Sequence, residues 1–250
     1  MTLVLWDIDG TLVRCGSVGA DVFDRAIAAT VGTPPPVRVP MSGKTDPQIA
    51  AEHLAAMGWS PVDIEAVLPA VLARLAAELA EARAELAAQA TLPPGVGVLL
   101  PRLAAEGSCR QSTLTGNIAP NAAVKLGVFG LERWLDLEIG AYGSDARDRR
   151  ELVPVALARA EARRGWRFEP REVWVVGDSP NDLACARAAG VRCLLVATGR
   201  FGVDELAAEV PDAVAEDLAD VDAMAGLLRS VGPAVNPTGG RGRRPGRPGG

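Results

Sequence analysis

The order of apolar runs and helical stretches along the chain predicts an α/β fold. Residues 2–6 (TLVLW) form a short apolar run typical of a buried strand, and further strands are expected at 109–115, 173–177 and 193–198. These segments alternate with helical stretches in the second part of the chain, and the segment LDLEIGAY (135–142) falls in the same series. Strands that alternate with helices indicate a mostly parallel, doubly wound sheet.

The first strand is separated from the others by residues 14–91, whose pattern is almost entirely helical. A helix is expected from about residue 17 to residue 31. Asp46 before Pro47 is typical of a helix N-cap and first helical position, and Ser60 with an acid three residues later begins another helix.

An apolar stripe runs through the second half of this helical block. Its positions lie three and four residues apart: Leu68, Leu72, Leu75, Leu79, Ala82 and Leu86. Such a stripe is usually the packed face between helices, and a dimer interface is the alternative. We expect Pro69 to bend or divide the helix near its start.

The position of the helical block predicts the domain organisation. We expect an all-α cap at 14–91, inserted into an α/β core formed by 1–13 and 92–231. Residues 232–250 (GPAVNPTGGRGRRPGRPGG) contain almost no apolar side chains, so we expect a disordered tail.

Composition and charge exclude several classes of protein. The 250 residues are 48% hydrophobic and carry a formal net charge of −5, which argues against nucleic acid as a main partner. No apolar run approaches the roughly 20 residues that span a bilayer. The four cysteines form no CxxC pair, which favours buried thiols in a reducing compartment. We therefore expect a cytoplasmic protein, a monomer or homodimer.

Candidate chemistry gathers where the predicted strands end. Asp7 and Asp9 follow the first strand, and Asp178 and Asp182 follow the strand at 173–177. Ligands of parallel α/β sheets gather at the carboxyl ends of the strands. Four carboxylates in one place would repel each other and hold protons, unless a hard cation such as Mg²⁺ binds among them.

These motifs resemble those of the haloacid dehalogenase (HAD) superfamily, whose members carry DxDGT, then Ser or Thr with Gly-Asn, a basic residue, and GDSxxD. The chain has DIDGT at 7–11, TGN at 115–117 and GDSPND at 177–182, in the family's order. The resemblance covers about residues 1–230 and includes a helical cap after the first motif, as in phosphoglycolate phosphatases.

The resemblance implies a role for each motif residue. Asp7 would be the nucleophile that attacks phosphorus, and Asp9 would be the general acid and base. Thr115, with Gly116 and Asn117, would hold the phosphoryl oxygens, together with Gly10 and Thr11 of the first motif. The implied cofactor is Mg²⁺, with Asp7, Asp9 (through its carbonyl), Asp178 and Asp182 as the ligand set.

The third motif departs from the family pattern. Relatives usually have Lys-Pro before the next helix, whereas this chain reads SDARDRRELVP at 144–154. We expect Arg149 to pair with Asp7 and the phosphate, with Arg147 and Arg150 as alternatives.

The cap stretch MSGKTDPQI (41–49) resembles the substrate-facing loop of helical-capped relatives. Lys44 and Thr45 would then point toward the substrate, and cap closure would exclude water. The equally weighted alternative is that Gly43 to Asp46 only turn the chain and cap a helix.

The expected function is Mg²⁺-dependent hydrolysis of a small phosphate monoester, phosphoglycolate-like or a sugar phosphate, through a phospho-aspartate. The second aspartate, Asp9, favours phosphoryl transfer over dehalogenation, because a leaving alkoxide needs a proton. The alternatives are a phosphomutase, a 2-haloacid dehalogenase and a non-catalytic binding module. The chain lacks a G-x-S-x-G nucleophile elbow, and His53 is its only histidine, which argues against a serine triad.

Overall fold

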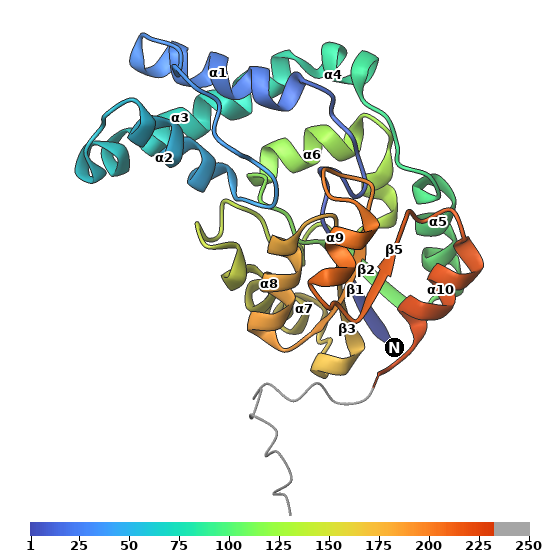
Figure 1. The fold of residues 1–250 in the computed structure, drawn as a ribbon. Coiled ribbons are helices and arrows are strands. Elements are labelled where there is room, and N and C mark those ends of the chain that lie inside the picture. The colour runs from blue at the N-terminus through green and yellow to red at the C-terminus, as the bar shows by residue number, and fades with distance from the viewer. Residues whose placement is uncertain (233–250) are drawn as a thin grey trace, which may run out of the picture.

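A computed structural model describes residues 1–232 of the chain. Five parallel strands form one sheet in the order β2-β1-β3-β4-β5 (Figure 1). The strands are β1 (Thr2–Trp6), β2 (Cys109–Thr113), β3 (Val173–Gly177), β4 (Arg192–Val196) and β5 (Ala213–Ala215). This parallel sheet, flanked by helices, confirms the predicted α/β fold class.

The first strand lies near the middle of the sheet. Thr2 of β1 is opposite Cys109 of β2, and Leu3 is opposite Val173 of β3. The strand order changes direction here, because β2 lies on one side of β1 and all later strands lie on the other. In open α/β sheets, the crevice outside the carboxyl ends of the strands at such a switch point is where ligands bind.

Successive side chains of β1 point into two separate cores. Val4 and Trp6 pack in the core shared with α5 (Val96–Glu106) and α10 (Val221–Arg229). Leu3 and Leu5 pack in the other core, which contains side chains of α7 (Leu152–Arg164) and α8 (Pro180–Ala189). Both faces of the sheet are therefore covered, which explains why the strand is a continuous apolar run.

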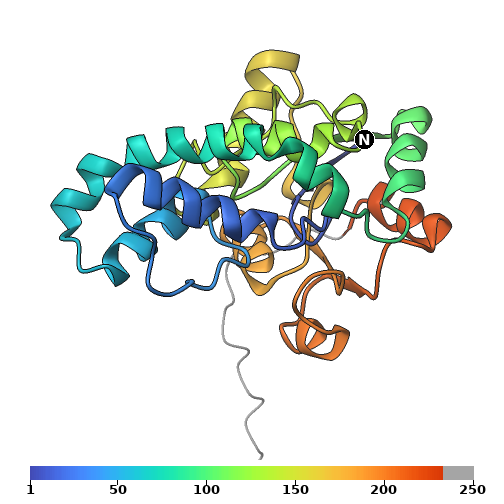
Figure 2. The same ribbon diagram turned by 90° about the horizontal axis from the view of Figure 1, so that it is seen from above.

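Four further helices form a group beyond the carboxyl ends of the strands (Figure 1). They are α1 (Val18–Val31), α2 (Asp46–Ala56), α3 (Pro61–Glu81) and α4 (Arg83–Gln89). Figure 2 shows α3 lying beside α1, and the predicted stripe is buried there, with Leu75 and Leu86 fully inaccessible. The stripe is therefore used as a packed face between helices.

The two segments that enter and leave this helical group run side by side. The backbones of Arg14 and Thr91 exchange two hydrogen bonds, each of 2.9 Å between nitrogen and oxygen. The division into a cap at 14–91 and a core at 1–13 and 92–231 stays a prediction, which this pairing supports. The predicted tail lies outside the described residues, except for Gly232.

Several expected elements differ in the structure. The N-cap of α2 is Thr45 rather than Asp46, because the Thr45 hydroxyl accepts a hydrogen bond from the Gln48 backbone N–H. Pro69 does not divide helix α3, which continues to Glu81; the burial of Leu68 and Val71 on either side of the proline favours the helix. A bend at Pro69 stays a prediction.

Two strand expectations also change. The segment 135–142 forms no strand, and only Ala141 makes an isolated bridge, to Leu114. The short strand β5 was not expected, because its alanine-rich sequence carries almost no strand signal. The remaining elements are α6 (Ala119–Gly127), α9 (Val203–Ala208) and the short 3₁₀ helices Leu131–Trp134, Arg149–Glu151 and Pro170–Glu172.

The cysteines are buried free thiols, as predicted. Among the helices of residues 1–232, none combines the length and the apolar character that crossing a bilayer requires.

The helical group should depend on its buried stripe. We expect Leu75→Ala to lower the free energy of unfolding by about 2–5 kcal/mol, because it opens a cavity at a fully buried position of α3. Val62→Ala on the same helix is the control: Val62 is exposed, so its change should stay within about 0.5 kcal/mol. Urea unfolding measures both, and equal effects would contradict burial of the stripe.

Candidate active site

A cavity of about 330 Å³ lies at the carboxyl end of the sheet, between the core and the helical group. Its core side carries Asp7, Asp9 and Asp178, and its opposite side carries apolar residues that include Phe23 and Ile49. The cavity therefore joins a strongly polar floor to a largely apolar wall.

Three carboxylates meet at the floor of this cavity: Asp7 and Asp178 line it, and Asp182 lies buried behind them. Oxygen atoms of Asp7, Asp178 and Asp182 all lie within 4.8 Å of one another, and all three residues are buried. Asp7 follows β1, whereas Asp178 and Asp182 follow the neighbouring strand β3. The parallel pairing of these two strands brings together residues that are far apart in the sequence.

Close packing around Asp178 requires glycine in the first motif. A Cβ at Gly10 would lie 2.4 Å from an Asp178 carboxylate oxygen, and the φ angle of Gly10 is +80°. Both observations exclude other side chains without a shift of the loop. The Thr198 hydroxyl donates a 2.5 Å hydrogen bond to the Gly10 carbonyl and ties this loop to the segment after β4.

Burial makes the carboxylate cluster costly to ionise. It raises the pKa of Asp7, and the Arg149 guanidinium offsets only part of this rise. Burial also raises the pKa of Asp178, and the negative charges of Asp182 and Asp7 raise it further. No lysine or arginine of residues 1–232 forms an ion pair with Asp178.

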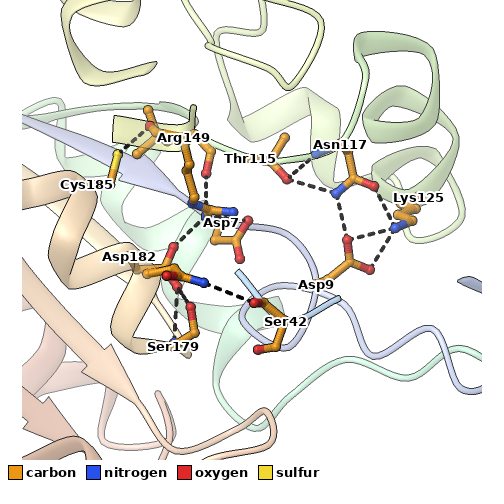
Figure 3. A network of polar contacts seen from close by, with 12 residues as sticks. Asp7, Asp9, Ser42, Thr115, Asn117, Lys125, Arg149, Ser179, Asp182 and Cys185 are labelled. Carbon is orange, nitrogen blue, oxygen red and sulfur yellow. Dashed lines mark hydrogen bonds and ion pairs between the residues drawn. The ribbon is translucent and has the colours of Figure 1, made fainter. Parts of the chain in front are cut away.

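Arg149 supplies the positive charge for the other two members of the cluster. Its Nη2 lies 3.0 Å from Asp7 Oδ1 and 2.5 Å from Asp182 Oδ1, and the side chain is buried (Figure 3). Arg147 instead pairs with Glu65 of α3, and Arg150 pairs with Asp148; both arginines are exposed. Of the three candidate arginines, Arg149 alone therefore reaches the cavity floor.

Asp9 turns away from this cluster and pairs with Lys125 of α6. The Lys125 ammonium lies 2.7 and 2.8 Å from the two Asp9 carboxylate oxygens (Figure 3). Burial would raise the pKa of Asp9, but the charge and hydrogen bonds of Lys125, with donors on Asn117 and Cys15, hold it below its usual value. Burial raises the pKa of the Cys15 thiol to about 12, so this thiol stays a donor.

The TGN segment is joined to the same pair. The Asn117 side-chain nitrogen donates to Asp9 (2.6 Å) and to the Thr115 hydroxyl (2.8 Å), while its carbonyl oxygen accepts from Lys125 (2.6 Å). Thr115 and Gly116 line the cavity beside Asn117. Both polar atoms of the Asn117 side chain are thus hydrogen-bonded within the protein. The Thr115 hydroxyl acts there as an acceptor, so its proton is available for an acceptor in the cavity.

The sequence analysis missed Lys125 because it follows no family motif. Two signals were present. The buried positions of α6 are Asn121, Ala122, Lys125 and Leu126, so the lysine interrupts the buried face of a helix. The chain also has only two lysines, Lys44 and Lys125, and both line this cavity.

The loop before α2 is seated against the core. The Asp46 backbone N–H donates to the Gly116 carbonyl (2.7 Å), and the buried Asp46 carboxylate accepts from the Ile118 N–H (2.8 Å). A Cβ at Gly116 would lie 2.0 Å from the Lys44 carbonyl oxygen, so the contact requires glycine. The cavity is therefore enclosed on this side by residues 41–46.

Some predicted site residues lie elsewhere than expected. Thr45 does not line the cavity, because its hydroxyl donates to the Arg147 carbonyl (2.7 Å). Lys44 does line the cavity, and its ammonium pairs with Glu52. Thr11 is fully buried beside the cavity without lining it, and its hydroxyl has no hydrogen-bond partner within residues 1–232. The Asp9 side chain is likewise not part of the carboxylate cluster.

The cluster suits a hard divalent cation. Asp7, Asp178 and Asp182 offer only carboxylate oxygens, the donors that Mg²⁺ prefers, and contain no sulfur or imidazole. Burial is the main cause of the raised pKa values of Asp7 and Asp178, and neighbouring carboxylates add to it; a cation at the cluster would favour the ionised forms of both.

Removing Arg149 should be far more damaging than removing its neighbour. We expect Arg149→Met to lower the free energy of unfolding by about 3–5 kcal/mol, because Asp7 and Asp182 lose their buried partner. Arg150→Met, which breaks an exposed pair, should change it by less than about 1 kcal/mol. Thermal and urea unfolding test this, and comparable losses would contradict the distinct placement of the two arginines.

The seated loop should make stability depend on pH. Burial raises the pKa of Asp46 from 3.8 to about 6, so the folded protein holds this proton more tightly than the unfolded chain. The contribution of Asp46 to stability therefore falls as pH rises from about 4 to about 6. In Asp46→Asn this dependence is absent, so the variant should gain about 3 kcal/mol relative to wild type between pH 4 and 7.

Urea unfolding at several pH values measures that difference. Asp204→Asn, a change at an exposed position of α9, is the control and should follow the wild-type curve. A difference between Asp46→Asn and wild type that does not vary with pH would contradict the expectation.

Comparison with known proteins agrees with the motifs. A family model described as haloacid dehalogenase-like hydrolase matches residues 4–187. A phosphoglycolate phosphatase of Rhodospirillum rubrum is 30% identical over 237 residues, which cover 94% of this chain and 95% of the relative. A phosphoglycolate phosphatase of Photorhabdus laumondii is 28% identical over 236 residues, covering 90% and 92%.

Solved structures share the fold. The crystal structure of a hydrolase from Pseudomonas syringae matches with a TM-score of 0.66 at 18% identity, and the match covers 92% of this chain and 100% of that one. The family model and the relative that is 30% identical along nearly its whole length show that this chain belongs to the haloacid dehalogenase-like hydrolase family, as its motifs predict.

Proposed function

We propose that the protein is a phosphatase that hydrolyses a small phosphate monoester through a phospho-aspartate on Asp7. The observation that carries this proposal is the placement of Asp7: its buried carboxylate lines the cavity at the end of β1, 3.0 Å from the Arg149 guanidinium. Arg149 favours the ionised form of Asp7, which is the form that can attack phosphorus.

In the first step an Asp7 oxygen bonds to phosphorus while the bond from phosphorus to the leaving oxygen breaks. Asp9 is the general acid: the negative charge of a bound phosphate favours its protonated form, and it gives that proton to the leaving oxygen as the product alcohol departs. In the second step Asp9 takes a proton from water as the water oxygen attacks phosphorus, which releases inorganic phosphate and restores Asp7.

The charge on the phosphoryl oxygens needs donors and cations around it. Thr115 suits this role, because the residue lines the cavity and its hydroxyl accepts a hydrogen bond from Asn117, so the hydroxyl proton stays available to donate. We assign the neighbouring backbone of Gly10 and Gly116 to the same task. Asn117 acts mainly by holding Thr115 and Asp9 in place.

Asp7, Asp178 and Asp182 are the side chains we propose to hold Mg²⁺, with the Asp9 carbonyl as a further ligand. When bound there, the ion would neutralise the carboxylates and the phosphate charge.

The substrate class we propose is a phosphoglycolate-like or sugar phosphate. Two relatives of nearly the same length are named phosphoglycolate phosphatase, and a cavity of about 330 Å³ accommodates a small phosphate ester. Apolar residues of the cap side would lie against the carbon end of the substrate and exclude water.

The test is phosphate release from a panel of phosphorylated metabolites, which includes phosphoglycolate and sugar phosphates, with Mg²⁺ or EDTA. We expect release that requires Mg²⁺ and that falls by at least about a thousandfold in Asp7→Asn, because the nucleophile is lost. Asp222→Asn, at an exposed position of α10, should retain full activity.

Activity that survives in Asp7→Asn would contradict the assigned nucleophile. Activity that is indifferent to EDTA would contradict the metal. Absence of release across the whole panel would contradict the phosphatase itself.

A further inference from the structure

Lys125 is the one buried cation of the cavity that no step above uses. Its side chain is 9% exposed, although α6 exposes other positions, such as Pro120 and Ala123. The ammonium makes three contacts, two with Asp9 oxygens and one with the Asn117 carbonyl oxygen. These contacts use all three of its N–H groups.

The orientation of Asp9 depends on this lysine. The Asp9 side chain is 45% exposed to the cavity, and its other partners are the Asn117 amide nitrogen (2.6 Å) and the Cys15 thiol (3.2 Å). Arg149, the other buried cation, lies with Asp7 and Asp182 (Figure 3). Within residues 1–232, Lys125 is the only cation that pairs with Asp9.

Lys125 also fixes the orientation of Asn117. By occupying the Asn117 carbonyl oxygen, the ammonium turns the amide nitrogen toward Asp9 and Thr115. The lysine thereby joins the residue proposed to donate a proton to the residue proposed to hold the phosphoryl group.

We propose that Lys125 is a positioning residue that holds the Asp9 carboxyl group where it can give its proton to the leaving oxygen. This inference rests on the proposed phosphatase function. Lys125 transfers no proton itself. When one Asp9 oxygen carries the proton, the ammonium keeps its contact with the other oxygen and with Asn117.

The consequence is selective for the leaving group. An alkyl phosphate such as phosphoglycolate loses an alkoxide, which needs a proton, so its hydrolysis depends on Asp9. Acetyl phosphate is of similar size but loses acetate, which is stable without that proton. The second step, in which Asp9 takes a proton from water, is the same for both substrates, so only the first step distinguishes them. A residue that acts through Asp9 should therefore slow transfer of the phosphoryl group to Asp7 from the first substrate and slow it little from the second.

The experiment measures kcat and KM of wild type and Lys125→Met with phosphoglycolate and acetyl phosphate. If phosphoglycolate is not the preferred ester, the alkyl phosphate hydrolysed best in the panel replaces it. The quantity compared is kcat/KM, because it reports the steps up to the loss of the leaving group and not the later attack of water. We expect kcat/KM for the alkyl ester to fall by about 10- to 100-fold, and kcat/KM for acetyl phosphate to fall less than about threefold. The ratio of the two rates is independent of the fraction of folded enzyme, so a partly unfolded variant still gives the answer.

A double-mutant cycle tests whether the effect passes through Asp9. We expect Asp9→Asn to show the same selectivity, and Lys125→Met combined with Asp9→Asn to lose nothing more on the alkyl ester. Arg83→Met is the matched control, because Arg83 contacts the Gly127 carbonyl of the same helix α6 (3.1 Å) and does not line the cavity. It should leave both rates unchanged.

Equal losses on both substrates, or a further loss in the double variant, would overturn the positioning role. If Lys125→Met does not fold, Lys125→Gln keeps a donor for one Asp9 oxygen and should give a weaker effect of the same selectivity. Failure of wild type to hydrolyse either substrate would instead overturn the phosphatase proposal, and this inference with it.

Discussion

Four carboxylates at the carboxyl end of two neighbouring strands are the constraint on which the rest of this structure depends. Ionised carboxylates in a buried place repel each other and lose the solvation of water, so each needs a compensating partner. Arg149 lies against Asp7 and Asp182, and Lys125 lies against Asp9. Asp178 has no such partner within the described residues. Its negative charge is therefore the one left uncompensated, and it lies next to the proposed nucleophile, where a bound cation would neutralise it.

The two cations divide the cavity floor into two functional halves. The Arg149 half contains the cluster of Asp7, Asp178 and Asp182, where we place the metal and the attack on phosphorus. The Lys125 half contains Asp9 and the TGN segment, where we place proton transfer and part of the phosphoryl contacts. In each half, a residue of the segment after β1 pairs with a cation from a different part of the core, so the chemistry depends on the packing of α6 and of the turn before α7.

Close backbone contacts then connect the cavity to the helical group. The loop at 41–46 lies directly on the TGN segment, with a contact to Gly116 that leaves no space for a Cβ. A substrate enclosed by this loop would meet the polar floor on one side and the apolar wall on the other. The loop therefore helps to enclose the cavity mainly through its backbone contacts with the TGN segment. Thr45 contributes less, because its hydroxyl caps α2 and bonds to the Arg147 carbonyl.

The sequence alone was sufficient to predict the α/β class and the cluster of carboxylates in the site. A buried parallel sheet requires apolar runs, and its geometry brings all strand ends to one edge, so local pattern was sufficient to bring Asp7 and Asp178 together. The sequence favoured Arg149 but left Arg147 and Arg150 as alternatives, and only the tertiary structure distinguishes the three, because they differ in burial and in partners. The role of Lys125 is also visible only in the tertiary structure. Lys125 and Asp9 are 116 positions apart in the sequence, and the packing of α6 brings them together. Long-range ion pairs leave no periodic signal in a chain, whereas strands and helices do.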